Sequence, residues 1–108
     1  MQTIVRDTLT KKAKVVDFAN VGPFFREVRI DTPSDSGDFK SLTMVELMDR
    51  VNRHLKKKER PITLSILSRL EHGHNEFGGY LMRVMQVARA LDCTVTFTSA
   101  NRSATFKP

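Results

Sequence analysis

The segment from residue 62 to residue 97 constrains the fold more than any other part of the chain, because it holds start and stop signals in order. It reads ITLSILSRLEHGHNEFGGYLMRVMQVARALDCTVTF. Thr63 is a favourable N-terminal cap for a short helix, and Gly73 can take the left-handed conformation that ends one. A longer helix is predicted after this glycine, with an apolar stripe at helical spacing formed by Tyr80, Leu81, Val84, Val87, Ala88 and Leu91. The segment therefore predicts two consecutive helices separated by a glycine stop.

A strand is predicted directly after the second helix. Asp92 lies where the backbone must turn, and aspartate tolerates the left-handed conformation better than most residues. The residues TVTFT at positions 94–98 then alternate, with Val95 and Phe97 on one face. A lone strand cannot satisfy its own backbone hydrogen bonds. We therefore expect it to pair with an N-terminal hairpin or with the same strand of a second subunit, and the second arrangement makes Val95 and Phe97 dimerisation residues.

This order of elements resembles the second half of the helix-turn-helix domain of the Xre, or lambda-repressor-like, family of DNA-binding regulators, which includes helix-turn-helix antitoxins. Members commonly have a recognition helix that starts at Ser or Thr and ends in L-E-x-G, followed by a helix that ends in A-x-A-L. This chain has LEHG at residues 70–73 and ARAL at residues 88–91. The resemblance covers roughly the C-terminal half of the chain. It implies a mainly α fold, in which a helix-turn-helix domain at residues 41–98 carries a C-terminal β-strand.

The first forty residues predict strands rather than helices. Residues 14–18 and 24–30 are rich in β-branched and aromatic side chains, and the segment between them contains Gly22 and Pro23. Two such runs with a glycine-containing connection predict a β-hairpin. The stretch FFREV could alternatively begin a helix after Pro23. We therefore expect a loose arm at residues 1–13, followed by an N-terminal β-hairpin.

A breaker separates this region from the rest of the chain. The stretch DTPSDSGDFK at residues 31–40 contains one proline, one glycine, two serines and three aspartates. We expect a loop there. It divides the chain into an N-terminal arm and hairpin at residues 1–40, the helix-turn-helix domain at residues 41–98 and a flexible tail at residues 99–108.

The first helix of the predicted domain has a clear start signal. Thr43 and Glu46 form a capping-box pattern, and Ser41 is a competing cap. Apolar residues follow at helical spacing: Met44, Leu47, Met48, Val51 and Leu55. We expect this helix to run to about Lys57 and to stop before Pro61. The basic stretch HLKKKERP makes the connection to the next helix longer than the short turn that is usual in the family.

The helix predicted at residues 63–72 has the position of a recognition helix. Leu67 and Leu70 are spaced to face inward, and four residues are spaced to face outward: Leu64, Ser65, Ser68 and Arg69. The resemblance implies that this outward set contacts DNA bases. Arginine can form two hydrogen bonds with guanine, serine can bond to base edges or phosphates, and leucine can touch a thymine methyl group. In an alternative register, the helix that begins near Phe77 reads the DNA instead.

The positive charge of the chain is concentrated in the half that resembles a DNA-binding domain. The net charge is +6, and residues 1–40 hold seven basic and six acidic residues, against eleven and six in residues 41–108. Basic residues attract phosphates and release counterions from DNA. We predict contacts to DNA phosphates from Arg53, Lys56, Lys57, Lys58, Arg60, Thr63, His72 and His74. His72 and His74 flank Gly73, but without a third ligand nearby they do not indicate a metal site.

The sequence favours neither an enzyme nor a membrane protein. It has no glycine-rich phosphate loop, no CxxC pair and no HExxH motif, so we expect no catalysis and no cofactor. Cys93 is the single cysteine, which excludes an internal disulfide. No apolar run approaches the roughly 18 residues of a membrane span, and the N-terminus lacks the apolar region of a signal peptide. We therefore expect a cytoplasmic protein.

Charge and resemblance together predict a sequence-specific regulator of transcription that binds double-stranded DNA as a homodimer, and we expect it to act as a repressor. The alternative is the antitoxin of a toxin–antitoxin pair, which binds both its operator and a toxin protein, with residues 1–40 as the protein-binding element. RNA binding is a weaker hypothesis, because no aromatic residues interleave the lysines to stack on bases.

Overall fold

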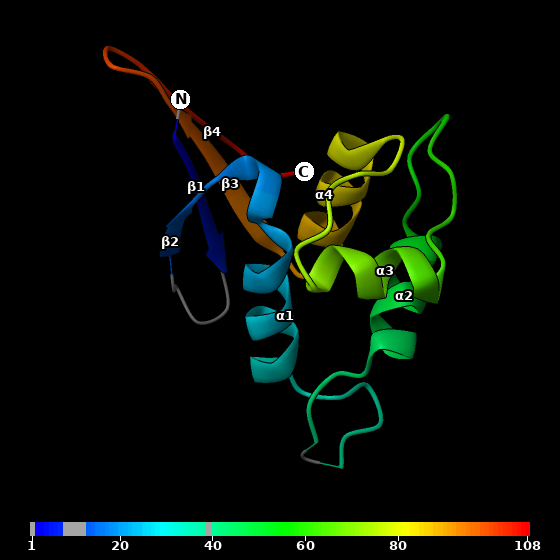
Figure 1. Cartoon of the computed structure of the whole chain (residues 1–108). Coiled ribbons are helices and arrows are strands. Elements are labelled where there is room, and N and C mark those ends of the chain that lie inside the picture. Colours follow the sequence, from blue (N-terminus) through cyan, green and yellow to red (C-terminus); the bar gives the residue numbers. More distant parts are fainter. Residues whose placement is uncertain (1, 8–12, 39) are drawn as a thin grey trace.

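The computed structural model describes residues 2–7, 13–38 and 40–108. Within these residues the chain forms four α-helices and a four-stranded antiparallel sheet, so the fold is mixed α and β rather than mainly α. The strands lie together at one side of the molecule, and α4 contacts β3 (Figure 1). The helices are α1 (Gly22–Asp31), α2 (Met44–Arg53), α3 (Leu64–Glu71) and α4 (Tyr80–Ala90). The strands are β1 (Gln2–Asp7), β2 (Ala13–Val16), β3 (Cys93–Thr98) and β4 (Ser103–Phe106), and a short 3-10 turn, η1 (Phe18–Asn20), precedes α1.

Most of the hydrophobic core lies among the helices. α3 contacts α1 and α2, and α4 contacts α2, α1 and β3. Fully buried side chains come from each helix, including Phe25, Leu47, Leu67 and Val87. The sheet contributes Val5, Cys93 and Val95 to the same core, and the later residues of β3 are only half-buried. The helices therefore supply the body of the domain, and the sheet extends from it.

The stretch FFREV is helical, so the predicted β-hairpin with residues 24–30 as its second strand is wrong, and the alternative of a helix after Pro23 is confirmed. Proline fits the first helical turn, because the N–H that it lacks has no intrahelical partner there. Phe24, Phe25 and Val28 are all buried, and their spacing places them on one helical face. Burial of this face outweighs the β preference of the individual residues.

Gly22 allows α1 to approach the end of α3 closely. A Cβ atom at this position would overlap the carbonyl oxygen of Leu70. Any other residue would therefore push the two helices apart. The glycine that reads as a turn residue in the sequence is a packing residue in the structure.

The sheet has the strand order β2-β1-β3-β4. β1 and β4 form where a loose arm and a flexible tail were predicted, so those predictions are wrong for residues 2–7 and 103–106. Part of the predicted arm, residues 8–12, lies outside the described residues. β1 pairs with β3 so that Val5 lies opposite Val95, which is far away in the sequence. Such long-range pairing leaves no local pattern from which it could be predicted.

β3 has a neighbour on each side. An N-terminal hairpin does pair with it, but this hairpin is formed by β1 and β2, and β4 occupies the other edge. An unpaired strand was the reason for expecting dimerisation through β3, and that reason does not hold. Val95 is 1% exposed, and Phe97 packs between the rings of Phe18 and Phe106.

The local start and stop signals are confirmed. Thr43 and Glu46 form the capping box of α2, and Thr63 caps α3. Gly73 has a φ of 89° and Asp92 a φ of 56°, so both take the left-handed conformation predicted for them. These signals depend on one or two residues each, which is why the sequence alone reveals them.

Two details of the predicted helices differ. α2 ends at Arg53 rather than near Lys57, and the side chain of Asn52 bonds to the backbone N–H and carbonyl of Ile62, at 2.8 and 3.1 Å. These bonds bring the chain back toward α3. On α4, Leu81 is 57% exposed and lies outside the buried stripe to which its spacing assigned it.

Candidate nucleic-acid interface

The accessible side of α3 carries all four residues predicted to contact bases. Leu64 is 39% exposed, Ser65 and Arg69 are exposed, and Ser68 is half-buried. Leu67 and Leu70 are fully buried on the opposite side. The structure therefore separates the helix into an anchored face and an accessible face.

Both ends of α3 are held by hydrogen bonds. At the start, the exposed Thr63 side chain accepts a bond from the amide of Ile66 at 3.2 Å. At the end, the amides of Gly73 and His74 bond to the carbonyl oxygens of Leu70 and Arg69, both at 3.0 Å. This pattern closes a helix with a left-handed glycine. It fixes the length of the accessible face.

A buried ion pair fixes α3 against α1. Nε and Nη2 of Arg29 donate to the carboxylate of Glu71 at 2.7 and 2.8 Å, and Nη1 donates to the carbonyl oxygen of Leu42 at 2.9 Å. The side chains are 13% and 1% exposed. Removing one partner of such a pair costs about 3–5 kcal/mol. The contact therefore sets the position of α3. Its only sign in the sequence is an acidic residue directly after the inward-facing Leu70.

The two histidines predicted to contact phosphates lie at the end of α3. Both are exposed, and Nδ1 of His72 lies 2.7 Å from the carbonyl oxygen of Ser68. In the part of the chain that the structure describes, no three His, Cys, Asp or Glu residues are grouped as metal ligands would be. His72 and His74 are therefore placed as surface groups beside Gly73.

The connection between α2 and α3, residues 54–63, is bound to α4; we call it the basic connection. Nη1 of Arg83 donates to the carbonyl oxygens of Arg60 and Pro61 at 2.9 and 3.0 Å. Nε2 of Gln86 donates to the same oxygen of Arg60 at 2.7 Å. Both donor side chains are buried, and burial lowers the pKa of Arg83, with a further contribution from the charge of Arg60. Arg83 and Gln86 of α4 thus hold the connection by its backbone.

The one acid in the basic connection is bound by α4 rather than by the lysines. Nη1 and Nη2 of Arg89 donate to the two carboxylate oxygens of Glu59, both at 2.8 Å, and Nη1 also donates to the carbonyl oxygen of His54 at 3.0 Å. The amide of Lys56 donates to the same carboxylate at 2.9 Å. These bonds, those from Arg89 above all, lower the pKa of Glu59 from 4.5 to about 2.

The basic side chains of this connection point into solvent. The amide of Glu59 bonds to the carbonyl oxygen of Lys56 at 3.0 Å, which closes a turn with Lys57 and Lys58 at its tip. Lys58 has a φ of 71°, a conformation that costs a non-glycine residue about 1–2 kcal/mol. The three lysines and Arg60 are exposed, and none forms an ion pair with another described residue. The turn therefore presents concentrated positive charge directly ahead of α3.

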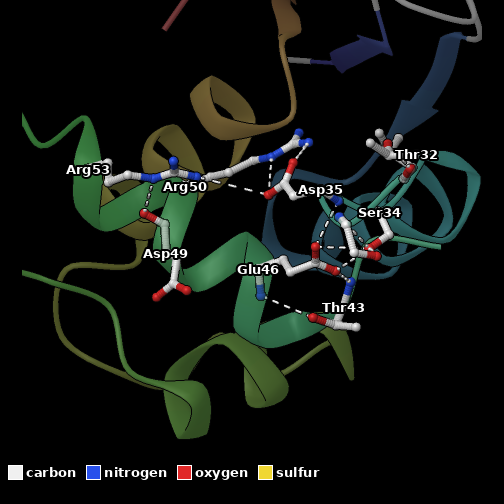
Figure 2. A network of polar contacts seen from close by, with 10 residues as sticks. Thr32, Ser34, Asp35, Thr43, Glu46, Asp49, Arg50 and Arg53 are labelled. Atoms are coloured by element: carbon white, nitrogen blue, oxygen red, sulfur yellow. Dashed lines mark hydrogen bonds and ion pairs between the residues drawn. The ribbon is translucent and has the colours of Figure 1, made fainter. Parts of the chain in front are cut away.

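Arg53 differs from the other predicted phosphate contacts, because an acid lies beside it. Nη2 of Arg50 donates to Asp35 at 2.6 Å, and Nη2 of Arg53 lies 4.0 Å from the other carboxylate oxygen. Figure 2 shows the carboxylate next to both arginines. The bond from Arg50, above all, lowers the pKa of Asp35. The charge of Arg53 is thus partly balanced within the chain, which makes it a weaker candidate for a phosphate contact than the lysines.

Comparisons with models of protein families, with curated proteins and with solved structures found no match. Among the described residues, no helix is both long enough and apolar enough to cross a membrane. The function is therefore inferred from the residues and geometry of the chain itself.

Proposed function

We propose that this protein binds double-stranded DNA sequence-specifically and regulates transcription as a repressor. α3 serves as the recognition helix of a helix-turn-helix motif, and the basic connection binds the phosphates beside it. One observation supports the proposal: Leu64, Ser65, Ser68 and Arg69 lie on the accessible side of a firmly held helix, directly after a fixed turn of unpaired positive charge.

The order of the helices favours α3 over α4 as the reader. α1 precedes α2 and supplies a leading helix, so α2 and α3 can take the two positions of the motif. In the alternative register α4 would enter the groove. Three polar residues of α4 are already engaged in holding the basic connection: Arg83, Gln86 and Arg89. α4 therefore supports the interface rather than reading bases.

The two groups of residues have different roles in this proposal. Arg69 donates two hydrogen bonds to a guanine, Ser65 bonds to a base edge or a phosphate, and Leu64 touches a thymine methyl group. These contacts depend on the base sequence. The lysines of the basic connection and Arg60 neutralise phosphates, which strengthens binding to every duplex and makes it depend on salt.

The protein acts as a homodimer in this proposal, because two recognition helices can read half-sites about one helical turn apart. β3 cannot extend its hydrogen bonding to a second copy, since β1 and β4 occupy both of its edges. Sedimentation with a palindromic duplex tests this part, and a single protomer bound at saturation would contradict it.

Two single substitutions test the assigned roles on a duplex that the protein selects from random sequence. Arg69→Ala should cost about 1–3 kcal/mol of binding free energy and relax the preference at one base pair. Lys57→Ala should weaken the selected and the scrambled duplex alike, and reduce the salt dependence by about one unit. Equal effects of both variants on both duplexes would contradict the assignment. Binding to no duplex at all would instead favour a protein partner, as in the antitoxin hypothesis.

A further inference from the structure

The guanidinium group of Arg69 lies over an aromatic ring that belongs to another segment. Its central carbon, Cζ, lies 5.4 Å from the ring centroid of Phe77, in the loop between α3 and α4. This is within the distance at which a cation is attracted to the face of an aromatic ring. The contact joins the proposed recognition helix to Phe77, a residue to which the proposed function assigns no role.

Phe77 is itself held in place by other aromatic residues. It is half-buried against the core, and its ring meets that of Tyr80 edge-on, with centroids 5.7 Å apart. The hydroxyl of Tyr80 donates to the carbonyl oxygen of Phe18 at 2.7 Å, and the rings of Phe18 and Tyr80 also meet edge-on. The ring under Arg69 is therefore part of an anchored aromatic group rather than a free surface side chain.

The cation–π contact leaves the N–H groups of Arg69 unused. A guanidinium group is planar, so it can stack through its face while the N–H groups on its edge bind another partner. Arg29, Arg83 and Arg89 donate from their edges to carboxylates or carbonyl oxygens. The guanidinium of Arg69 forms no hydrogen bond or ion pair with any residue that the structure describes, and the residue is exposed.

A long side chain loses rotamer freedom when it binds a base, and prior restriction reduces that loss. We propose that Phe77 is a positioning residue that restrains Arg69 through the cation–π contact, so that the free N–H groups of Arg69 are presented to a guanine and the preference at that base pair is set. This inference rests on the proposed function, because it assumes that Arg69 reads a base.

The test compares the protein with Phe77→Leu, which removes the ring, and Phe77→Tyr, which keeps it. Phe106→Leu is the matched control, because it removes an exposed ring on β4 that stacks on Phe97 instead of on an arginine. Thermal melting confirms that each variant folds. In the free protein, NMR should show a ring-current shift of the Arg69 side-chain protons that Phe77→Tyr retains and Phe77→Leu loses.

On the selected duplex, Phe77→Leu should reduce the preference for the base pair read by Arg69 about two- to fivefold, the range expected for an exposed cation–π contact. Phe77→Tyr should restore that preference, and Phe106→Leu should leave it unchanged. Affinity for scrambled duplex should be the same in all four proteins.

The outcomes separate this inference from the proposed function. Suppose that Arg69→Ala relaxes the preference at one base pair, but Phe77→Leu has the same preference there as the original protein. The inference is then overturned, and the proposed function stands. The inference is also overturned if the Arg69 side-chain protons have the same chemical shifts in the original protein and in the Phe77→Leu variant. If the protein selects no duplex, the proposed function fails and the inference falls with it.

Discussion

The two connections that flank α2 differ in whether their charges are paired within the chain. The connection before α2 is acidic: Asp35 pairs with Arg50 and Arg53 on the helix (Figure 2). The carboxylate of Asp38 lies 4.0 Å from the Lys40 ammonium group. The basic connection after α2 has four basic residues and one acid, and α4 takes up that acid. One connection balances its charges inside the chain, and the other is left with positive charge facing solvent.

This difference makes the basic connection the better candidate for binding a polyanionic partner. Surface ion pairs add little to stability. Those of the acidic connection are explained by the local order that they give to the loop, without any partner. Unpaired lysines on a turn repel one another, and Lys58 also has an unfavourable backbone conformation. Hydrogen bonds from the buried side chains of Arg83 and Gln86 nevertheless hold this connection in place. We therefore favour phosphate binding over stability as the explanation for its charge.

The largest effect is expected from removing the partner of Glu59. Arg89→Met should lower the free energy of unfolding by at most about 3 kcal/mol at pH 7, because Arg89 is the largest of the causes that bring the pKa of Glu59 from 4.5 to about 2. A lowered pKa means that the stabilisation is complete above pH 4.5 and is lost as the pH falls toward 2. Urea unfolding of the protein and of Glu59→Gln across this range measures the difference. The same pH profile in both would show that the pair does not hold the basic connection.

The salt dependence of DNA binding should change next most. Replacing Lys56, Lys57 and Lys58 together by glutamine should reduce the slope of log affinity against log salt by about 3, at about 0.9 for each phosphate contact. Stability should change little, because these side chains are exposed. Lys40→Gln, in the acidic connection, is the control and should leave the slope unchanged. An unaltered slope in the triple variant would remove the basic connection from the interface.

A smaller effect separates binding from stability at the tip of the turn. Lys58→Gly removes one charge and also relieves the left-handed backbone, whose φ is 71°. Stability should stay equal or rise by up to about 1 kcal/mol, while the salt slope falls by about one unit. Lys58→Ala removes the same charge without relieving the backbone, so it should match Lys58→Gly in binding and be the less stable of the two in thermal unfolding.

The smallest effect is expected in the acidic connection. Asp35→Asn frees Arg50 and Arg53, which should slightly raise the affinity for every duplex, more at low salt, without changing the selected sequence. Asp38→Asn is the control, since its nearest cation is the exposed Lys40. Filter binding at two salt concentrations measures both. A changed base preference in Asp35→Asn would mean that this connection lies in the interface.

Features that depend on adjacent residues could be predicted from the sequence, and features that depend on distant partners could not. The capping box of Thr43 and Glu46 and the glycine stop at Gly73 follow local rules, and the structure has both. FFREV fits a strand or a helix, and only burial of Phe25 against the other helices decides between them. β1 and β4 gain their hydrogen bonds from β3, so their own sequences carry little signal.

The candidate site shows the same division. The outward set on α3 follows from helical spacing, and the structure leaves it accessible. The contacts that hold the site join residues far apart in the sequence: Arg29 with Glu71, Arg89 with Glu59, and Arg83 with the backbone of Arg60. A lone arginine in a sequence gives no indication of which distant acceptor it will meet.

Selection of bound sites from random duplex DNA tests the central claim most directly. The proposed function predicts a palindromic sequence, bound far more tightly than its scrambled version at physiological salt, with half-sites about one helical turn apart. Uniform binding to every duplex that disappears with added salt would contradict it, and would leave a basic surface without sequence recognition.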